Sequence, residues 1–128
     1  MKSDIINGKS TIIVDDHLLF TNGLTRILED IGLKVHSTFS NAQEAIIYLK
    51  NQNVDIIFSD INMPIMDGIE LTKTIRQLNN HKSVPVLVLS TEDRDILKKD
   101  ASIAGANGWI VKPFSPTDLI EKVRTVIQ

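Results

Sequence analysis

Short apolar runs along the chain alternate with amphipathic segments. Residues 54–58 and 84–89 are almost continuously apolar, and so is the shorter run 11–14. Residues 33–37 instead alternate between apolar and polar side chains, and residues 109–111 form a very short run. Continuous apolar runs are typical of strands covered on both faces, whereas alternation is typical of a half-exposed strand. The pattern therefore predicts five strands, with the first, third and fourth at the centre of a sheet and the second and fifth at its edges.

Each of these runs is followed by a segment with helical spacing. The first helix repeats apolar residues on one face and ends before Gly32; those residues are Leu24, Ile27, Leu28 and Ile31. Later helices open with N-terminal capping signals, which are Ser40 with Gln43, Asp67 with Glu70, and Ser115 before Pro116. Ser90 is also expected to cap the helix that follows it.

Strands that alternate with helices favour a parallel sheet, because parallel neighbours need crossover connections. Right-handed crossovers, with the two weakest strands at the edges, give the order 2-1-3-4-5. We therefore predict an α/β fold, a flavodoxin-like (βα)5 doubly wound parallel sheet. Residues 1–9 are expected to form a flexible N-terminal arm and residues 10–128 the folded domain.

The composition narrows the class of protein. The chain has 128 residues, of which 42% are hydrophobic, and this is enough for one domain with a real core. It has no cysteine, which excludes disulfides, thiolate metal sites and thiol catalysis. The net charge of -2 disfavours a nucleic-acid surface, and no apolar run approaches the roughly 20 residues of a membrane span. We expect a cytoplasmic protein without direct contact to nucleic acid or membrane.

Polar side chains stand where four of the predicted strands end. These are Asp15 and Asp16, Asp60, Ser90, and Lys112. Because the carboxyl ends of parallel strands share one edge, we expect these groups to meet. Close carboxylates repel unless they are neutralised, and carboxylate, carbonyl and water oxygens are the ligands of Mg²⁺, with Mn²⁺ as the alternative ion. An ammonium and a hydroxyl donor nearby would stabilise phosphoryl oxygens, so Asp60 is the candidate nucleophile for an aspartyl phosphate.

Four motifs at matching intervals carry a family resemblance. They are "VDD" at 14–16, "DINMPIMDG" at 60–68, "LST" at 89–91 and "KPF" at 112–114. On these motifs the chain resembles the receiver domains of two-component response regulators and is CheY-like. The match runs from about Ser10 to the C-terminus. The resemblance implies a signalling module, not an enzyme, whose only catalysis concerns its own phosphorylation and dephosphorylation.

The resemblance implies a phosphoacceptor and a metal site. Asp60 would take a phosphoryl group from a sensor histidine kinase or a histidine phosphotransfer protein. Asp16 and Asp60 would bind Mg²⁺ directly, Asp15 would bind it through water, and the backbone carbonyl of Asn62 would complete the ligand set. Residues expected to modulate access to the phosphoacceptor are Asn62, Thr91 and Glu92.

The resemblance also implies a switch. Lys112, joined to Pro113 by a cis bond, would pair with the phosphoryl group, and Ser90 would move toward it. Trp109 stands at the position of the switch aromatic and would turn inward as Ser90 leaves. The change would reach a downstream protein through the face of the fourth helix, fifth strand and fifth helix. That partner face comprises Asp95, Lys98, Lys99, Ser102, Trp109 and Lys122.

Several alternatives stay open at this point. A stand-alone regulator, monomeric or dimeric upon phosphorylation, is our first interpretation. "VDDHLLFTNGL" also resembles the start of NarL-type receivers, so the chain could be the N-terminal receiver fragment of a DNA-binding regulator. A magnesium-dependent phosphatase would require a second acid–base carboxylate two positions after Asp60, where Asn62 stands. We interpret His17 and His36 as surface residues, His17 with at most a modest electrostatic influence on the metal, and we assign no role to His81.

Overall fold

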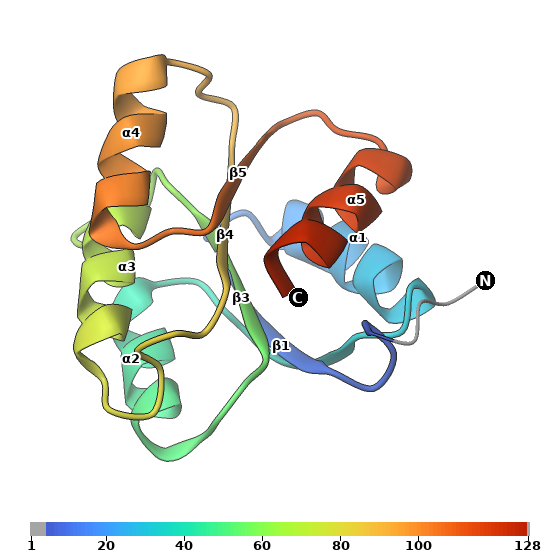
Figure 1. The fold of residues 1–128 in the computed structure, drawn as a ribbon, viewed down its shortest axis with the longest axis horizontal. Coiled ribbons are helices and arrows are strands. Elements are labelled where there is room, and N and C mark those ends of the chain that lie inside the picture. Colours follow the sequence, from blue (N-terminus) through green and yellow to red (C-terminus); the bar gives the residue numbers. More distant parts are fainter. Residues whose placement is uncertain (1–4, 128) are drawn as a thin grey trace.

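The computed structural model describes residues 5–127, in which five strands alternate with five helices (Figure 1). Within these residues, no helix combines the length and the apolar character that a membrane crossing requires. The strands are β1 (Ser10–Val14), β2 (Lys34–Phe39), β3 (Ile56–Asp60), β4 (Val86–Ser90) and β5 (Gly108–Val111). The helices are α1 (Leu18–Asp30), α2 (Ala42–Asn51), α3 (Gly68–Gln77), α4 (Asp95–Ala104) and α5 (Pro116–Ile127).

The strands form one parallel sheet in the order β2-β1-β3-β4-β5. Figure 1 shows α1 and α5 on one face of this sheet and α2, α3 and α4 on the other. The predicted flavodoxin-like α/β fold and its strand order are therefore confirmed. Both edges are the strands with the weakest apolar signal.

The core follows from this layering. Every residue of β3 and β4 is buried, whereas residues of β2 alternate between exposed and half-buried. The central strands can be apolar on both faces because helices cover both. Three clusters of buried residues result, and their helical members are Leu24, Leu28, Leu119 and Val123 on one face, and Ala42, Ala45, Leu49, Leu71, Ile75 and Ala101 on the other.

Two of the predicted helix starts are confirmed and two are wrong. Asp67 accepts a hydrogen bond from the backbone N–H of Glu70 at 2.9 Å, and Ser115 accepts one from that of Asp118 at 3.0 Å. At α2 the capping residue is Asn41, not Ser40, because Asn41 has the extended backbone and its side chain accepts from Glu44 N–H. Ser90 caps no helix, because α4 begins only at Asp95.

The N-terminal segment is packed where the structure describes it. Residues 1–4 of the predicted flexible arm lie outside the described residues. Ile6 is fully buried in the core cluster on the face of the sheet covered by α1 and α5, and the N–H of Gly8 donates to the carbonyl of Gly32 at 2.8 Å. Residues 5–9 are thus not an arm but part of the folded unit. Burial of an apolar side chain, which periodicity in so short a segment cannot reveal, holds them there.

Candidate functional site

The site lies at the carboxyl ends of β1 and β3. These strands are hydrogen-bonded neighbours, and Val14 at the end of β1 pairs with Ser59. Asp15 follows directly after β1, and Asp60 is the last residue of β3, so both carboxylates lie at the same edge of the sheet. Each residue is only 4% exposed. The parallel arrangement therefore brings two buried acids together, as predicted from the strand ends.

Lys112 brings positive charge to these acids from the end of β5. Its Nζ lies 3.1 Å from Asp15 Oδ2 and 3.7 Å from Asp60 Oδ1. Its backbone N–H donates to the carbonyl of Ser90 at 2.8 Å, which fixes the end of β5 against β4. The ammonium also lies 3.8 Å from the centre of the Phe20 ring, and the Lys112–Pro113 peptide bond is cis. One cation thus serves two acids from two other strands.

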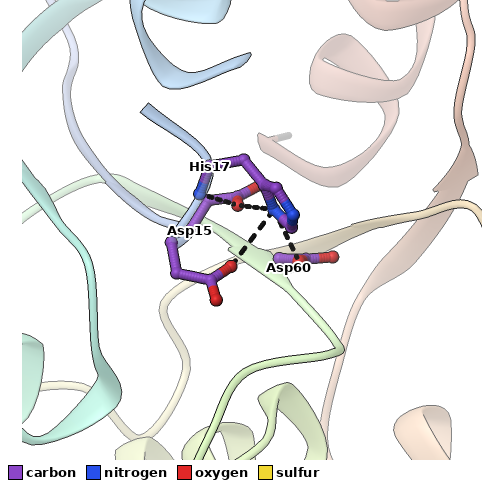
Figure 2. Close-up of side chains that lie close together, drawn as sticks. Asp15, His17 and Asp60 are labelled. Carbon is purple, nitrogen blue, oxygen red and sulfur yellow. Dashed lines mark hydrogen bonds and ion pairs between the residues drawn. The ribbon is translucent and has the colours of Figure 1, made fainter. Parts of the chain in front are cut away.

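His17 lies closer to this site than the modest electrostatic influence predicted from the sequence implied. Its Nδ1 lies 3.0 Å from Asp15 Oδ1 and 3.9 Å from Asp60 Oδ2 (Figure 2). It also lies 3.1 Å from Asp16 Oδ1. The side chain is 67% exposed, so its assignment to the surface holds, but the ring nitrogen faces the acids. Ionised carboxylates only accept hydrogen bonds, so the contact with Asp15 is a hydrogen bond when Nδ1 carries a proton. The signal available in the sequence was its position directly after the acidic pair.

The electrostatics of the site set Asp60 apart. Burial raises the pKa of Asp60 above its ordinary value, and the charge of Asp15 raises it further. Lys112 and a hydrogen bond from the N–H of Ile61, at 2.9 Å, act in the opposite direction without cancelling the effect. The pKa of His17 is raised in turn, chiefly by its hydrogen bond to Asp15. Burial of Asp60, together with the charge of Asp15, thus outweighs the compensation that Lys112 and the Ile61 N–H provide.

The donor set suits a hard divalent cation. Asp15, Asp16, His17 and Asp60 each offer one ligand atom, and these atoms all lie within 4.8 Å of one another. Carboxylate oxygens are the ligands that Mg²⁺ and Mn²⁺ prefer. Asn62 is exposed in the connection after β3, and its part as a backbone ligand stays a prediction.

Glu92, in the β4–α4 loop, links Ser90 to Trp109 through two hydrogen bonds. The buried Ser90 Oγ accepts a hydrogen bond from the N–H of Glu92 at 3.0 Å. The carbonyl of the same Glu92 accepts one from the indole N–H of Trp109, also at 3.0 Å. The Trp109 ring packs beside Val88 and Ala101 in a small cluster. The two predicted switch residues are therefore connected through this loop.

The residues predicted to modulate access sit on that same loop or near it. Thr91 is exposed, directly after Ser90. The Glu92 carboxylate is paired with Arg94, whose Nε lies 3.1 Å from it. Thr91, Glu92 and Asn62 therefore follow the strand ends that carry the site, and their effect on access stays a prediction.

The predicted partner face is continuous around Trp109. Trp109 lines one hollow with Lys98 and Ser102 of α4, and a second hollow with Lys122 of α5. Asp95 and Lys99 are exposed on α4. Lys98 is paired with Asp93 in the β4–α4 loop. The face is thus attached to the loop that links Ser90 to Trp109.

Comparisons with known proteins agree with this geometry. Residues 11–124 match the model of the response regulator receiver domain family. The chemotaxis protein CheY-3 of Vibrio cholerae is 32% identical over 128 residues, which cover 100% of this chain and 98% of that protein. The transcriptional regulatory protein DegU of Brevibacillus brevis is 35% identical over 123 residues, which cover 95% of this chain but 51% of that protein.

A solved structure extends the likeness to three dimensions. The CheX–CheY–BeF3–Mg²⁺ complex from Borrelia burgdorferi matches with a TM-score of 0.89 and 33% identity, covering 95% of this chain and 91% of that one. The predicted family resemblance is confirmed by these matches. The chain belongs to the response regulator receiver domains of two-component signalling, and among them it is CheY-like.

Proposed function

We propose that Asp60 is the phosphoacceptor of this receiver domain. The observation that carries the proposal is the position of its buried carboxylate, 3.7 Å from Lys112 and beside Asp15, Asp16 and His17. Asp60 Oδ forms a bond to phosphorus while the bond from phosphorus to a donor histidine nitrogen breaks. The donor imidazole takes up a proton in place of the phosphoryl group. The donor is a sensor histidine kinase or a histidine phosphotransfer protein.

Mg²⁺, or Mn²⁺ in its place, is the ion that the acidic cluster would hold. Asp16 and Asp60 would bind it directly, Asp15 through a water molecule, and Asn62 through its backbone carbonyl. When bound, the ion supplies positive charge to the carboxylates and to the phosphoryl oxygens. The carboxylate-rich donor set supports this assignment.

The residues around Asp60 stabilise the phosphorylated state. A phosphoryl group adds about -1.5 to -2 of charge and three acceptor oxygens. Lys112 already lies within 4 Å of Asp60 and donates to one of these oxygens. The Ser90 hydroxyl donates to another, and to reach it Ser90 releases the N–H of Glu92.

This release is the proposed switch. Glu92 also holds the indole of Trp109 through its carbonyl, so a movement of the loop changes the setting of Trp109. Trp109 lies at the centre of the face formed by α4, β5 and α5, which binds the downstream protein. The polar residues offered there are Asp95, Lys98, Lys99, Ser102 and Lys122.

We place the module in the cytoplasm, and its near-complete overlap with CheY-3 supports a CheY-like regulator as our first proposal. The half-length overlap with DegU marks the alternative, a receiver joined to a DNA-binding domain. The mass of the native protein in its source cells decides between the two.

Incubation with acetyl phosphate and Mg²⁺, followed by intact mass measurement, tests the phosphoacceptor. We expect one phosphoryl group on the wild type and none on Asp60→Asn, while the control Asp30→Asn, an exposed acid on α1, is labelled like the wild type. Absence of label on the wild type, or label that persists on Asp60→Asn, would overturn the proposal. Repeated turnover of a phosphomonoester would identify a phosphatase instead.

A further inference from the structure

The imidazole of His17 occupies an unusual place among the acids of the site. Its Nδ1 is within 3.1 Å of carboxylate oxygens from both Asp15 and Asp16, and within 3.9 Å of one from Asp60. Figure 2 shows the ring facing Asp15 and Asp60. The family resemblance assigns the metal to oxygen donors alone. A nitrogen donor at this position therefore calls for a separate account.

The separations match those of atoms that share one ion. Two donors bound side by side at about 2.1 Å from an octahedral ion stand about 3 Å apart. Nδ1 lies 3.1 Å from Oδ1 of Asp16, an acid expected to bind the ion directly, so these two atoms already have such a spacing. An ion bound to Nδ1 would take the place of a proton on that nitrogen.

The backbone around His17 directs the ring into the site. His17 is the N-terminal capping residue of α1, but its side chain makes no capping hydrogen bond to that helix. Its backbone N–H instead donates to Asp15 Oδ1 at 2.9 Å. This bond holds Cα of His17 beside the acid, and the ring needs no rearrangement to face the ligand oxygens.

We propose that His17 Nδ1 is an additional ligand of the metal that the proposed function requires, and that it sets the metal preference of this site. Imidazole favours Co²⁺, Ni²⁺ and Zn²⁺, whereas Mg²⁺ and Mn²⁺ favour oxygen ligands. His17 thus shifts the selectivity from Mg²⁺ toward ions that accept nitrogen. Relative to an all-oxygen receiver site, this site binds Co²⁺ more tightly and Mg²⁺ about equally.

The alternative role for His17, a positive charge that competes with the ion, would change the affinity for divalent cations differently. If the His17 ring acted only as a positive charge that occupies the site of the ion, its removal would tighten the binding of every divalent cation. If it is a ligand, its removal weakens Co²⁺ specifically. The sign of the change, and its dependence on the ion, therefore separate the two roles.

Calorimetric titrations of wild type and His17→Ala with Mg²⁺ and Co²⁺, at one pH where free imidazole is neutral, test the proposal. We expect the Co²⁺ dissociation constant to rise about tenfold or more, because even an outer-shell partner of a metal ligand is worth about 10–100-fold. The Mg²⁺ constant should change less than about fivefold, the effect of one exposed charge. His36→Ala, which removes a histidine on β2, is the matched control and should bind both ions like the wild type.

Pulsed EPR of bound Mn²⁺ gives a second reading that does not depend on affinity. The wild type should show coupling to a coordinated imidazole nitrogen, and His17→Ala should lack it. Equal changes for both ions, tighter Co²⁺ binding, or absent nitrogen coupling would overturn the proposal. Labelling of the same samples with acetyl phosphate separates this proposal from the proposed function. If the wild type is labelled but His17→Ala leaves the Co²⁺ dissociation constant unchanged, only the role of His17 is refuted. If the wild type is not labelled but His17→Ala weakens Co²⁺ binding as predicted, only the role of Asp60 as phosphoacceptor is refuted.

Discussion

At the scale of single residues, Asp60 is the side chain on which the site depends. Its side chain is 6% exposed, and its neighbours include another buried acid, Asp15. Burial is the largest cause of its raised pKa, and Lys112 offsets this only in part. An ionised Asp60 therefore destabilises the metal-free fold, and the same feature makes the site receptive to cations.

The pH dependence of stability follows from this shift. The folded chain holds the Asp60 proton more tightly than the unfolded chain, whose ordinary pKa is 3.8. Below that value both states are protonated and the penalty is absent. As the pH rises through the raised pKa of the folded state, the penalty becomes complete. At neutral pH, urea denaturation should therefore give Asp60→Asn a free energy of unfolding about 0.5–2 kcal/mol higher than that of the wild type. In acid below the ordinary pKa, the two proteins should have equal free energies of unfolding.

Added Mg²⁺ supplies the control for this prediction. The ion stabilises only the state that binds it, so it should raise the wild-type stability and reduce the advantage of Asp60→Asn. A wild type that is more stable than Asp60→Asn in metal-free neutral buffer would show that the local charges already compensate the burial of this carboxylate.

At the scale of elements, the start of α3 positions the end of β3. The N–H of Gly68 donates to the carbonyl of Ile61 at 3.0 Å, so the first turn of α3 lies against the strand end. A Cβ at Gly68 would overlap the carbonyl oxygen of Asp60 and lie 2.9 Å from Ile61 Cα. The close approach of helix and strand thus requires a residue without a side chain.

Gly68→Ala should lower the free energy of unfolding by about 1–3 kcal/mol, because backbone atoms cannot yield as a flexible side chain would. It should also slow labelling of Asp60, whose own backbone must move. Urea denaturation followed by Trp109 fluorescence, and the rate of acetyl phosphate labelling, measure the two effects.

Gly23→Ala is the matched control for this substitution. Gly23 lies inside α1, and a Cβ added there would have no neighbour within 4 Å, so alanine should stabilise the helix by about 0.5–1 kcal/mol. If both variants gained stability, the contact between α3 and β3 would have to be looser than the structure shows.

At the scale of the whole molecule, the folded unit begins before the first strand. Ile5 and Ile6 are adjacent, yet Ile5 is 39% exposed and Ile6 is fully buried. Ile6 belongs to the core cluster on the face of the sheet covered by α1 and α5. Ile6 therefore contributes to the stability of the whole domain, because its core cluster includes residues from several strands and helices.

Ile6→Ala should destabilise the protein by about 2–5 kcal/mol, the range for an aliphatic side chain removed from a packed core. Ile5→Ala should change stability by less than about 0.5 kcal/mol, as expected at the surface. Thermal and urea unfolding of the two variants provide the comparison. Equal effects would mean that residues 5–9 do behave as part of the predicted flexible arm.

Much of this architecture could be predicted from sequence because the signals are local. Continuous apolar runs identified β3 and β4 as central, and alternation identified β2 as an edge. Helix starts were less secure, since Asn41 and Ser40 are both good capping residues and only the backbone conformation selects Asn41. The strand-end acids were predictable because every parallel strand ends at the same edge.

The sequence by itself determined the layered fold, the strand order and the meeting of Asp15, Asp60 and Lys112, because hydrophobic periodicity and the handedness of crossovers leave few alternatives. Only the tertiary structure decided that Ile6 is buried, that Glu92 joins Ser90 to Trp109, and that the His17 ring faces three acids. These facts concern burial and contacts among side chains and backbone groups that only the folded structure brings together. Such contacts form only when the elements pack, and no periodicity along the chain encodes them.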